Sequence, residues 1–174
     1  MPEAARYSAI EVLRDGTRVE IRALRPEDRA AVLAAVDHTS ARSLYRRFFA
    51  ARRSFTEQEI AFFLNVDLAS HVALVAVVRH SDSGEEIVGG GRYIVLQPGR
   101  AEAAFTVVDQ FQGRGLGTML LRHLAAIARD AGIHEFVADV LPENTPMLQV
   151  FGHSGFPMTS RREPGVVHVT LRLT

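Results

Sequence analysis

Along the first third of the chain, apolar positions recur first with the period of strands and then with that of helices. Two apolar blocks, 9–13 and 17–24, flank Asp15-Gly16, a pair that favours a tight turn, so they predict a β-hairpin. Pro26-Glu27-Asp28 predicts the start of a helix, because proline suits a first helical turn and acidic groups complement the helix dipole. Residues 1–8 show neither period and are expected to form a loose extension. Two more helices are predicted, at 41–50 and after Thr56, which forms a capping-box pattern with Glu59.

The rest of the chain alternates between apolar runs of strand length and two helical patterns. The run 72–78 is apolar throughout and predicts a strand buried on both faces. In a second strand, at 87–96, Gly89-Gly90-Gly91 indicates a bulge or a close approach of another backbone. Further strands are predicted at 102–108, 136–141 and 166–173, and a short helix at 146–154. A long helix is predicted from an apolar stripe that Gly132 is placed to end, made of Leu116, Leu120, Leu124, Ile127 and Ala131. This order predicts an α/β layer structure with a mixed sheet.

Composition and charge narrow the classes of function. A chain of 174 residues can bury one proper core, and its Lys+Arg and Asp+Glu counts balance at 20 each, which argues against a nucleic-acid or membrane-surface binder. The absence of cysteine excludes disulfides, thiolate metal ligands and an acyl-cysteine intermediate, and is compatible with a cytoplasmic protein. No signal peptide or membrane-spanning run is visible. The seven histidines show no metal-ligand spacing, so no metal is expected.

The stretch Gln112-Gly113-Arg114-Gly115-Leu116-Gly117 joins the strand at 102–108 to the long helix. Alternate glycines let the backbone turn tightly and present N–H groups, and the helix start adds a positive dipole end, so the loop suits a phosphate or diphosphate group. It departs from the dinucleotide-binding fingerprint, because Thr118 stands where that motif has its third glycine, and from a P-loop, because no lysine is near. An ordinary glycine turn is the alternative interpretation.

A second motif follows this loop at a suitable distance. Asn144 comes after the strand that ends at Leu141, and it is followed by Met147 and then by Gly155-Phe156. With the loop, this order resembles the GNAT superfamily of acetyl-CoA-dependent N-acetyltransferases. The resemblance implies an α/β fold with a central mixed, mostly antiparallel sheet flanked by helices. It implies a single GNAT-like domain at 17–174, which an N-terminal extension and first hairpin strand at 1–16 precede. It also implies these acetyl-CoA-binding positions: Thr106, Val107, Val108, Gln112, Gly113, Arg114, Gly115, Leu116, Gly117, Thr118 and Asn144.

The N-terminal half carries a narrower resemblance. The segments Ser43 to Phe49, Val66-Asp67 and His71 to Ala76 resemble a bacterial branch of protein lysine acetyltransferases that inactivate acyl-CoA synthetases. This implies a protein lysine as acceptor, on an acyl-CoA synthetase. A small-molecule amine acceptor and a non-catalytic CoA-sensing module remain as alternatives, and both a monomer and a homodimer are compatible with the sequence.

Transfer of an acetyl group to an amine requires a base, because a lysine ammonium with a pKa of about 10.4 is almost fully protonated at neutral pH. Strand alternation places Glu102 on one face with Ala104 and Thr106, and the resemblance implies that Glu102 is the general base. A solvated strand-end glutamate beside Arg100 is the alternative interpretation. Without cysteine, transfer is expected to be direct.

Two further features bear on the chemistry. Many GNAT enzymes have a tyrosine seven residues after the asparagine, to protonate the leaving thiolate; here that position is Phe151, and Tyr45 or Tyr93 could substitute. A basic cluster could dock an acidic protein face or contact CoA phosphates, or could be a solvated helix face. Its members are Arg42, Arg46, Arg47, Arg52 and Arg53.

Overall fold

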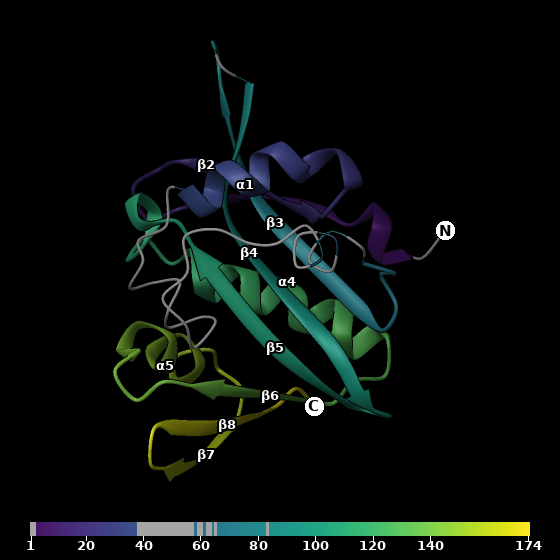
Figure 1. Ribbon diagram of the computed structural model, residues 1–174, viewed down its shortest axis with the longest axis vertical. Helices are drawn as coiled ribbons and strands as arrows, with labels where there is room; N and C mark the ends of the chain where they lie inside the picture. The colour runs from purple at the N-terminus through teal and green to yellow at the C-terminus, as the bar shows by residue number, and fades with distance from the viewer. Residues whose placement is uncertain (1–2, 38–57, 59–60, 62–63, 65, 83) are drawn as a thin grey trace.

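In the computed structural model, which describes residues 3–37, 58, 61, 64, 66–82 and 84–174, eight strands form one sheet (Figure 1). Their order is β1-β2-β3-β4-β5-β6-β8-β7, and neighbouring strands are antiparallel except for the parallel pair β5 and β6. The bounds are β1 (Ser8–Val12), β2 (Arg18–Ala23), β3 (His71–His80), β4 (Gly84–Gln97), β5 (Arg100–Val107), β6 (Glu135–Val140), β7 (Met158–Glu163) and β8 (Val166–Arg172). The prediction of a mixed, mostly antiparallel sheet is confirmed.

Helices cover both faces of the sheet (Figure 1). On one face, α4 buries six side chains: Leu116, Leu120, Leu121, Leu124, Ala125 and Ala128. On the other face, α1 packs Ala31 and Val32 against a second apolar cluster from β3 and β4. The helical elements are α1 (Arg29–Asp37), α4 (Leu116–Asp130) and α5 (Thr145–Gly152), with short 3-10 turns η1 (Glu3–Arg6), η2 (Pro26–Asp28) and η3 (Asp109–Phe111). Because helices lie on both faces, β3 is buried on both, as its apolar run predicts.

The N-terminal hairpin forms as predicted. β1 and β2 pair antiparallel, Gly16 has a φ of 91°, and the Asp15 carboxylate accepts the Thr17 N–H at 3.0 Å. The expectation of a loose extension at 1–8 is wrong for residues 3–8. These residues form η1 and the start of β1, and the Tyr7 hydroxyl hydrogen-bonds to His123 of α4, which fixes the segment to the body of the protein.

An ion pair fixes the start of α1 to β2. The Arg22 guanidinium donates to both Asp28 carboxylate oxygens, at 2.8 and 2.9 Å, and the Asp28 carboxylate also accepts the Arg25 N–H at 2.8 Å. Both side chains are buried. The predicted helix start is thus a 3-10 turn followed by α1, and one of its two acidic groups is part of the core.

The glycines of β4 have the two roles expected of them. The register with β3 shifts between Ala76 and Val77, which marks a bulge beside Gly89. A Cβ on Gly91 would lie 2.6 Å from the Phe105 ring on β5, so only glycine lets these strands pack as they do.

The structure adds one strand, corrects one predicted helix position, and leaves several predictions outside the described residues. β7 was not predicted, because its sequence, Met158–Glu163, is exposed throughout and has no apolar alternation. Ala131 is exposed beyond the end of α4, and the buried face of that helix is broader than the predicted stripe. The predicted helix at 41–50, with Tyr45 and the basic cluster, and the capping box of Thr56 and Glu59 all fall outside the described residues.

Candidate active site

The candidate site is a cleft of about 550 Å³ that is lined by residues of β5, β6, α4 and α5. It lies where the strands β5 and β6 diverge (Figure 1). The two strands are paired only from Arg100–Glu135 to Glu102–Val137, although β5 continues to Val107 and β6 to Val140. Beyond the last pair, the facing edges of β5 and β6 are separated, and the cleft opens between them. A strand edge that presents N–H and C=O groups can bind an extended ligand by backbone hydrogen bonds.

The glycine loop, residues 112–117, lies at the N-terminus of α4 beside this cleft. Gly113 and Gly115 have φ values of 78° and 91°, which glycine adopts without strain. Gly115 is the N-cap of α4 and brings no capping side chain, and the Met119 N–H bonds to its carbonyl at 3.1 Å. The N–H groups of the first turn, which precede Met119, therefore remain for a ligand at the positive end of the helix dipole. The loop fits an anionic group such as a diphosphate.

Other residues of the loop shape the site through contacts within the protein. A Cβ on Gly117 would lie 3.1 Å from Val150 of α5, so this glycine allows α4 and α5 to approach closely. The Gln112 side-chain amide donates to the Val107 carbonyl at 3.0 Å and so ties the loop to the end of β5. Arg114 pairs with Asp15 at 2.8 Å and lies over the Phe111 ring, and it does not line the cleft.

Two carboxylates face the cleft from opposite strands. Glu102 is exposed and lies at the apex, as the last residue of β5 that is paired with β6. Its neighbour Arg100 pairs with Glu135, at 3.1 Å between Nε and Oε1. The exposure of Glu102 fits both the predicted base and the alternative of a solvated strand-end glutamate. Asp139 of β6 also lines the cleft, two residues beyond the strand partner of Glu102.

His168 of β8 holds Asp139 in place. Its Nδ1 lies 2.6 Å from the Asp139 carboxylate, and its Nε2 lies 3.2 Å from the Glu163 carboxylate of β7. The hydrogen bond to Asp139, followed by that to Glu163, raises the pKa of His168 above its usual value. The charged imidazolium therefore engages Asp139, whereas Glu102 makes no such contact among the described residues.

The pKa of His168 is expected to exceed the usual histidine value of about 6.5 in a pH titration followed by NMR. Folding raises the pKa of His168, so the His168–Asp139 pair stabilises the fold fully at a pH below the unfolded-state pKa. This stabilisation is lost as the pH rises through the folded-state pKa. Asp139→Asn should lower the pKa towards 6.5, whereas Glu143→Gln should not change it. A wild-type pKa at or below 6.5 would contradict the charged pair.

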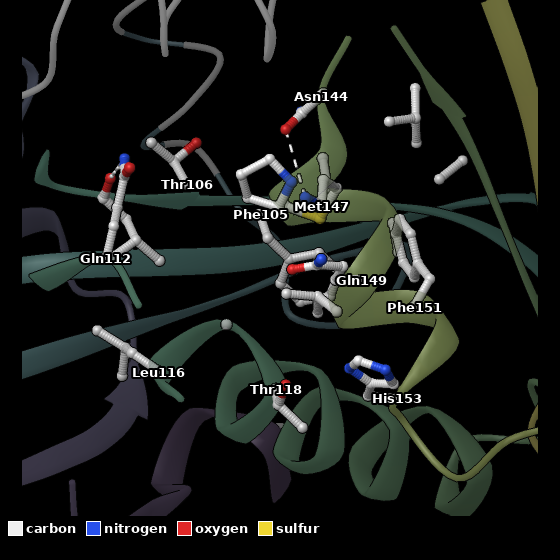
Figure 2. Close-up of a pocket in the computed structure, with 18 of the residues that line it drawn as sticks. Phe105, Thr106, Gln112, Leu116, Thr118, Asn144, Met147, Gln149, Phe151 and His153 are labelled. Atoms are coloured by element: carbon white, nitrogen blue, oxygen red, sulfur yellow. Dashed lines mark hydrogen bonds between the residues drawn. The ribbon is translucent and has the colours of Figure 1, made fainter. Parts of the chain in front are cut away.

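Aromatic and apolar side chains of β5 and α5 line part of the cleft, among them Phe105, Met147 and Phe151 (Figure 2). Phe151 of α5 is buried, lines the cleft, and packs edge-to-face on Phe105 with 6.1 Å between ring centroids. The side chain of Asn144 accepts the Met147 N–H at 3.3 Å and so caps α5 at the cleft wall (Figure 2). The position of the family's tyrosine is thus inside the cleft but carries no proton to donate.

Tyr93 does not replace that tyrosine. It is fully buried in the core beside Phe136, it does not line the cleft, and its hydroxyl has no hydrogen-bond partner among the described residues. Burial raises the pKa of Tyr93, which further disfavours its ionisation.

Tyr93→Phe is expected to leave acetyl transfer unchanged and to raise the free energy of unfolding by up to about 1 kcal/mol, because it removes a buried, unpaired hydroxyl. Urea unfolding followed by circular dichroism measures this. The matched variant Tyr7→Phe deletes a hydroxyl that is bonded to His123 and should lower the free energy of unfolding by about 1 kcal/mol. A loss of that size in Tyr93→Phe would show that its hydroxyl has a partner.

Most of the residues expected to bind the donor line the cleft, although their roles remain predictions: Thr106, Val107, Gln112, Gly113, Gly115, Leu116, Gly117, Thr118 and Asn144. Two do not. Arg114 turns to Asp15, and Val108 is buried with its N–H bonded to the Val88 carbonyl at 3.0 Å. Sequence reasoning missed Arg14 and Asp139, which also line the cleft. No local pattern marks Arg14, and Asp139 could have been found from its position near the end of a predicted strand beside that of Glu102.

Among the described residues, no group of His, Asp and Glu side chains is placed to hold a metal ion. None of the helices in that part of the chain is both long and apolar enough to cross a bilayer.

Comparisons with known proteins place this geometry in a family. The model of the acetyltransferase (GNAT) domain matches residues 18–157. The acetyltransferase PA5475 of Pseudomonas aeruginosa is 31% identical over 156 residues, which make up 89% of this chain and 82% of that protein. The acetyltransferase Pat of Mycolicibacterium smegmatis is 31% identical over 159 residues, but the chain spans only 46% of Pat.

Solved structures of acetyltransferases resemble this chain as well. The crystal structure of the GNAT domain of S. lividans PAT superposes with a TM-score of 0.85 and 33% identity, covering 95% of this chain and 96% of that one. The acetyltransferase yncA of Salmonella typhimurium, solved with its cofactor acetyl-CoA, shares the fold with a TM-score of 0.72 and 22% identity, covering 90% of this chain and 94% of that one. The diverging strands, the glycine loop and the matched domain have one explanation: the chain belongs to the GNAT acetyltransferase family.

Proposed function

We propose that this acetyltransferase transfers the acetyl group of acetyl-CoA directly to a lysine amine of a protein, with Glu102 as general base. The observation that carries the proposal is the position of Glu102 at the apex of the cleft, where β5 and β6 separate, in the same cleft that the glycine loop lines. An acyl-CoA synthetase is the acceptor to test first.

The glycine loop and the strand edges account for binding of the donor. The first-turn N–H groups of α4 bind the diphosphate, and the separated edge of β5 at Thr106 and Val107 binds the pantetheine arm. The packed rings of Phe105 and Phe151, which line the cleft, keep water from the thioester. Acetyl-CoA supplies the acetyl group on a thioester.

Glu102 acts on the acceptor side of the sheet. Its carboxylate takes a proton from the lysine ammonium, and the neutral nitrogen forms the new N–C bond as the C–S bond of the thioester breaks. The second proton that the nitrogen loses ends on the departing sulfur, so the products are the amide and the thiol of CoA. The thiolate leaves without help from position 151, since a thiol with a pKa of about 8.5 is a fair leaving group. Asp139 is held by His168, so Glu102 is the better placed of the two carboxylates to accept this proton.

Two likenesses of the same chain support a protein acceptor. The N-terminal half of the sequence resembles the branch that acetylates protein lysines, and over 95% of its length the chain resembles the S. lividans PAT domain. Glu102 is exposed, so an acceptor side chain can approach its carboxylate.

Mass spectrometry of acetylated peptides tests the acceptor class. The 174 residues contain no lysine, so every acetyl-lysine in the reaction belongs to an acceptor. The enzyme is incubated with acetyl-CoA and a purified acyl-CoA synthetase, and a reaction without enzyme measures spontaneous acetylation. We expect one or a few synthetase lysines to be acetylated only in the presence of enzyme.

Two other outcomes would replace the proposal. Rapid turnover on a small amine, with no modified protein in a treated lysate, would identify a small-molecule acetyltransferase with the same donor site. Tight binding of CoA in calorimetry, with no turnover on either class of acceptor, would identify a CoA-sensing module.

A further inference from the structure

The turn of the N-terminal hairpin reaches across the fold to the glycine loop. Asp15 in this turn pairs with Arg114 of the loop at 2.8 Å, although 99 positions separate them in the sequence. The Arg114 guanidinium also lies 4.7 Å from the centre of the Phe111 ring. The loop's own arginine is therefore engaged by the protein and holds the hairpin turn in place.

The neighbouring residue of the turn, Arg14, faces the cleft. Its Nε lies 3.5 Å from the point where a Cβ on Gly115 would stand, so the guanidinium is beside the N-cap of α4. Among the described residues that line the cleft, Arg14 is the only arginine, and the chain has no lysine. The cationic charge of this cleft wall thus comes from outside the glycine motif.

The hairpin is also anchored at its other end, so the position of Arg14 is defined before a ligand binds. The Tyr7 hydroxyl bonds to Nδ1 of His123 in α4, and the Glu11 carboxylate lies 2.8 Å from Nε2 of the same ring. The carboxylate of Asp15 additionally accepts the Thr17 N–H at 3.0 Å, which shapes the turn. The backbone that carries Arg14 is therefore held in place before a ligand binds, which lowers the cost of ordering it on binding.

We propose that Arg14 is a phosphate-binding residue of the donor site, which contacts the diphosphate of CoA together with the first-turn N–H groups of α4. The Asp15–Arg114 pair positions it. A guanidinium matches phosphate oxygens with two parallel N–H donors and adds the full charge that backbone dipoles lack. The proposal rests on acetyl-CoA as the donor of the proposed function and is independent of the acceptor.

Isothermal titration calorimetry with CoA and with 3′-dephospho-CoA tests this. Arg14→Gln should raise the Kd for both ligands about tenfold, and Arg14→Lys should restore part of the loss. Arg18→Gln is the matched control, because it removes the same charge from an exposed residue of the same hairpin that does not line the cleft. The Kd of this control for CoA should stay within about twofold of wild type. Steady-state kinetics should show a higher KM for acetyl-CoA in Arg14→Gln with kcat unchanged.

A double-mutant cycle tests the positioning role of Arg114. Arg114→Gln should weaken CoA binding in the wild-type background but have no further effect in the Arg14→Gln background. A Kd of Arg14→Gln within about twofold of wild type would overturn the proposal, and a loss seen with CoA but not with 3′-dephospho-CoA would overturn the assignment to the diphosphate. Failure of the wild-type protein to bind CoA would instead refute the donor in the proposed function.

Discussion

Glu102→Gln will lower kcat for acetylation of a protein lysine roughly 10²–10⁴-fold and leave the Kd for acetyl-CoA unchanged. Glu102 lies at the apex of the cleft. Its neighbours Ala101 and Ala103 belong to the core that α4 covers, so strand alternation puts Glu102 on the other face, whereas the donor phosphates are expected at the glycine loop. Glutamine keeps the size of the side chain and removes only its ability to take a proton. Initial rates at saturating acetyl-CoA, with calorimetry for the Kd, measure the two effects separately.

The pH dependence distinguishes a lost base from a distorted site. Without a base, the reaction depends on the fraction of lysine that is already neutral, which rises about tenfold per pH unit below the lysine pKa of about 10.4. The residual rate of Glu102→Gln should therefore rise steeply between about pH 7 and 9, while the wild-type rate rises much less. A variant that is merely distorted would keep the wild-type pH profile at a lower rate.

Two matched variants complete this test. Glu143→Gln removes a carboxylate near the start of α5 that does not line the cleft, and it should retain the wild-type rate. Asp139→Asn removes the second carboxylate of the cleft and should have a smaller effect than Glu102→Gln. If Asp139→Asn instead showed the larger loss and the steep pH profile, Asp139 would be the base and Glu102 would not.

The features that could be predicted from the sequence are those that local chemistry determines. The hairpin follows from Asp15-Gly16, β3 from an unbroken apolar run, and the glycine loop from its own spacing between a strand and a helix. Each needs only neighbouring residues to form. The fold class followed from the order of such elements, and the comparisons confirm it.

The features that could not be predicted depend on contacts between distant segments. Arg114 was expected to bind the donor, but its partner Asp15 lies 99 positions away, and only the folded sheet brings the hairpin turn beside the loop. The exposed edge strand β7 has no apolar face that could reveal it, because it stabilises the sheet through backbone pairing with β8. Arg14 could not be predicted for the same reason, because it lies at the cleft only when the sheet places the hairpin turn beside the loop.

Asp28→Asn will lower the free energy of unfolding by about 3 kcal/mol. The substitution keeps the shape of the side chain but leaves the Arg22 guanidinium, whose side chain is 3% exposed, without a compensating charge. Burial alone would raise the pKa of Asp28, but the hydrogen bonds from Arg22 and from the Arg25 N–H outweigh it, and the pKa is lowered. Urea unfolding at neutral pH, followed by circular dichroism, measures the loss.

The acid limb of the stability curve gives this prediction a second readout. Because folding lowers the pKa of Asp28, its stabilisation is present above the unfolded-state value of about 3.9 and is lost as pH falls through the folded-state value. Asp28→Asn should therefore lose less stability than the wild type on acidification. Asp130→Asn, at the exposed end of α4, is the control and should change stability by no more than about 0.5 kcal/mol. Equal losses in the two variants would mean that the Arg22–Asp28 pair does not hold the start of α1 on the sheet.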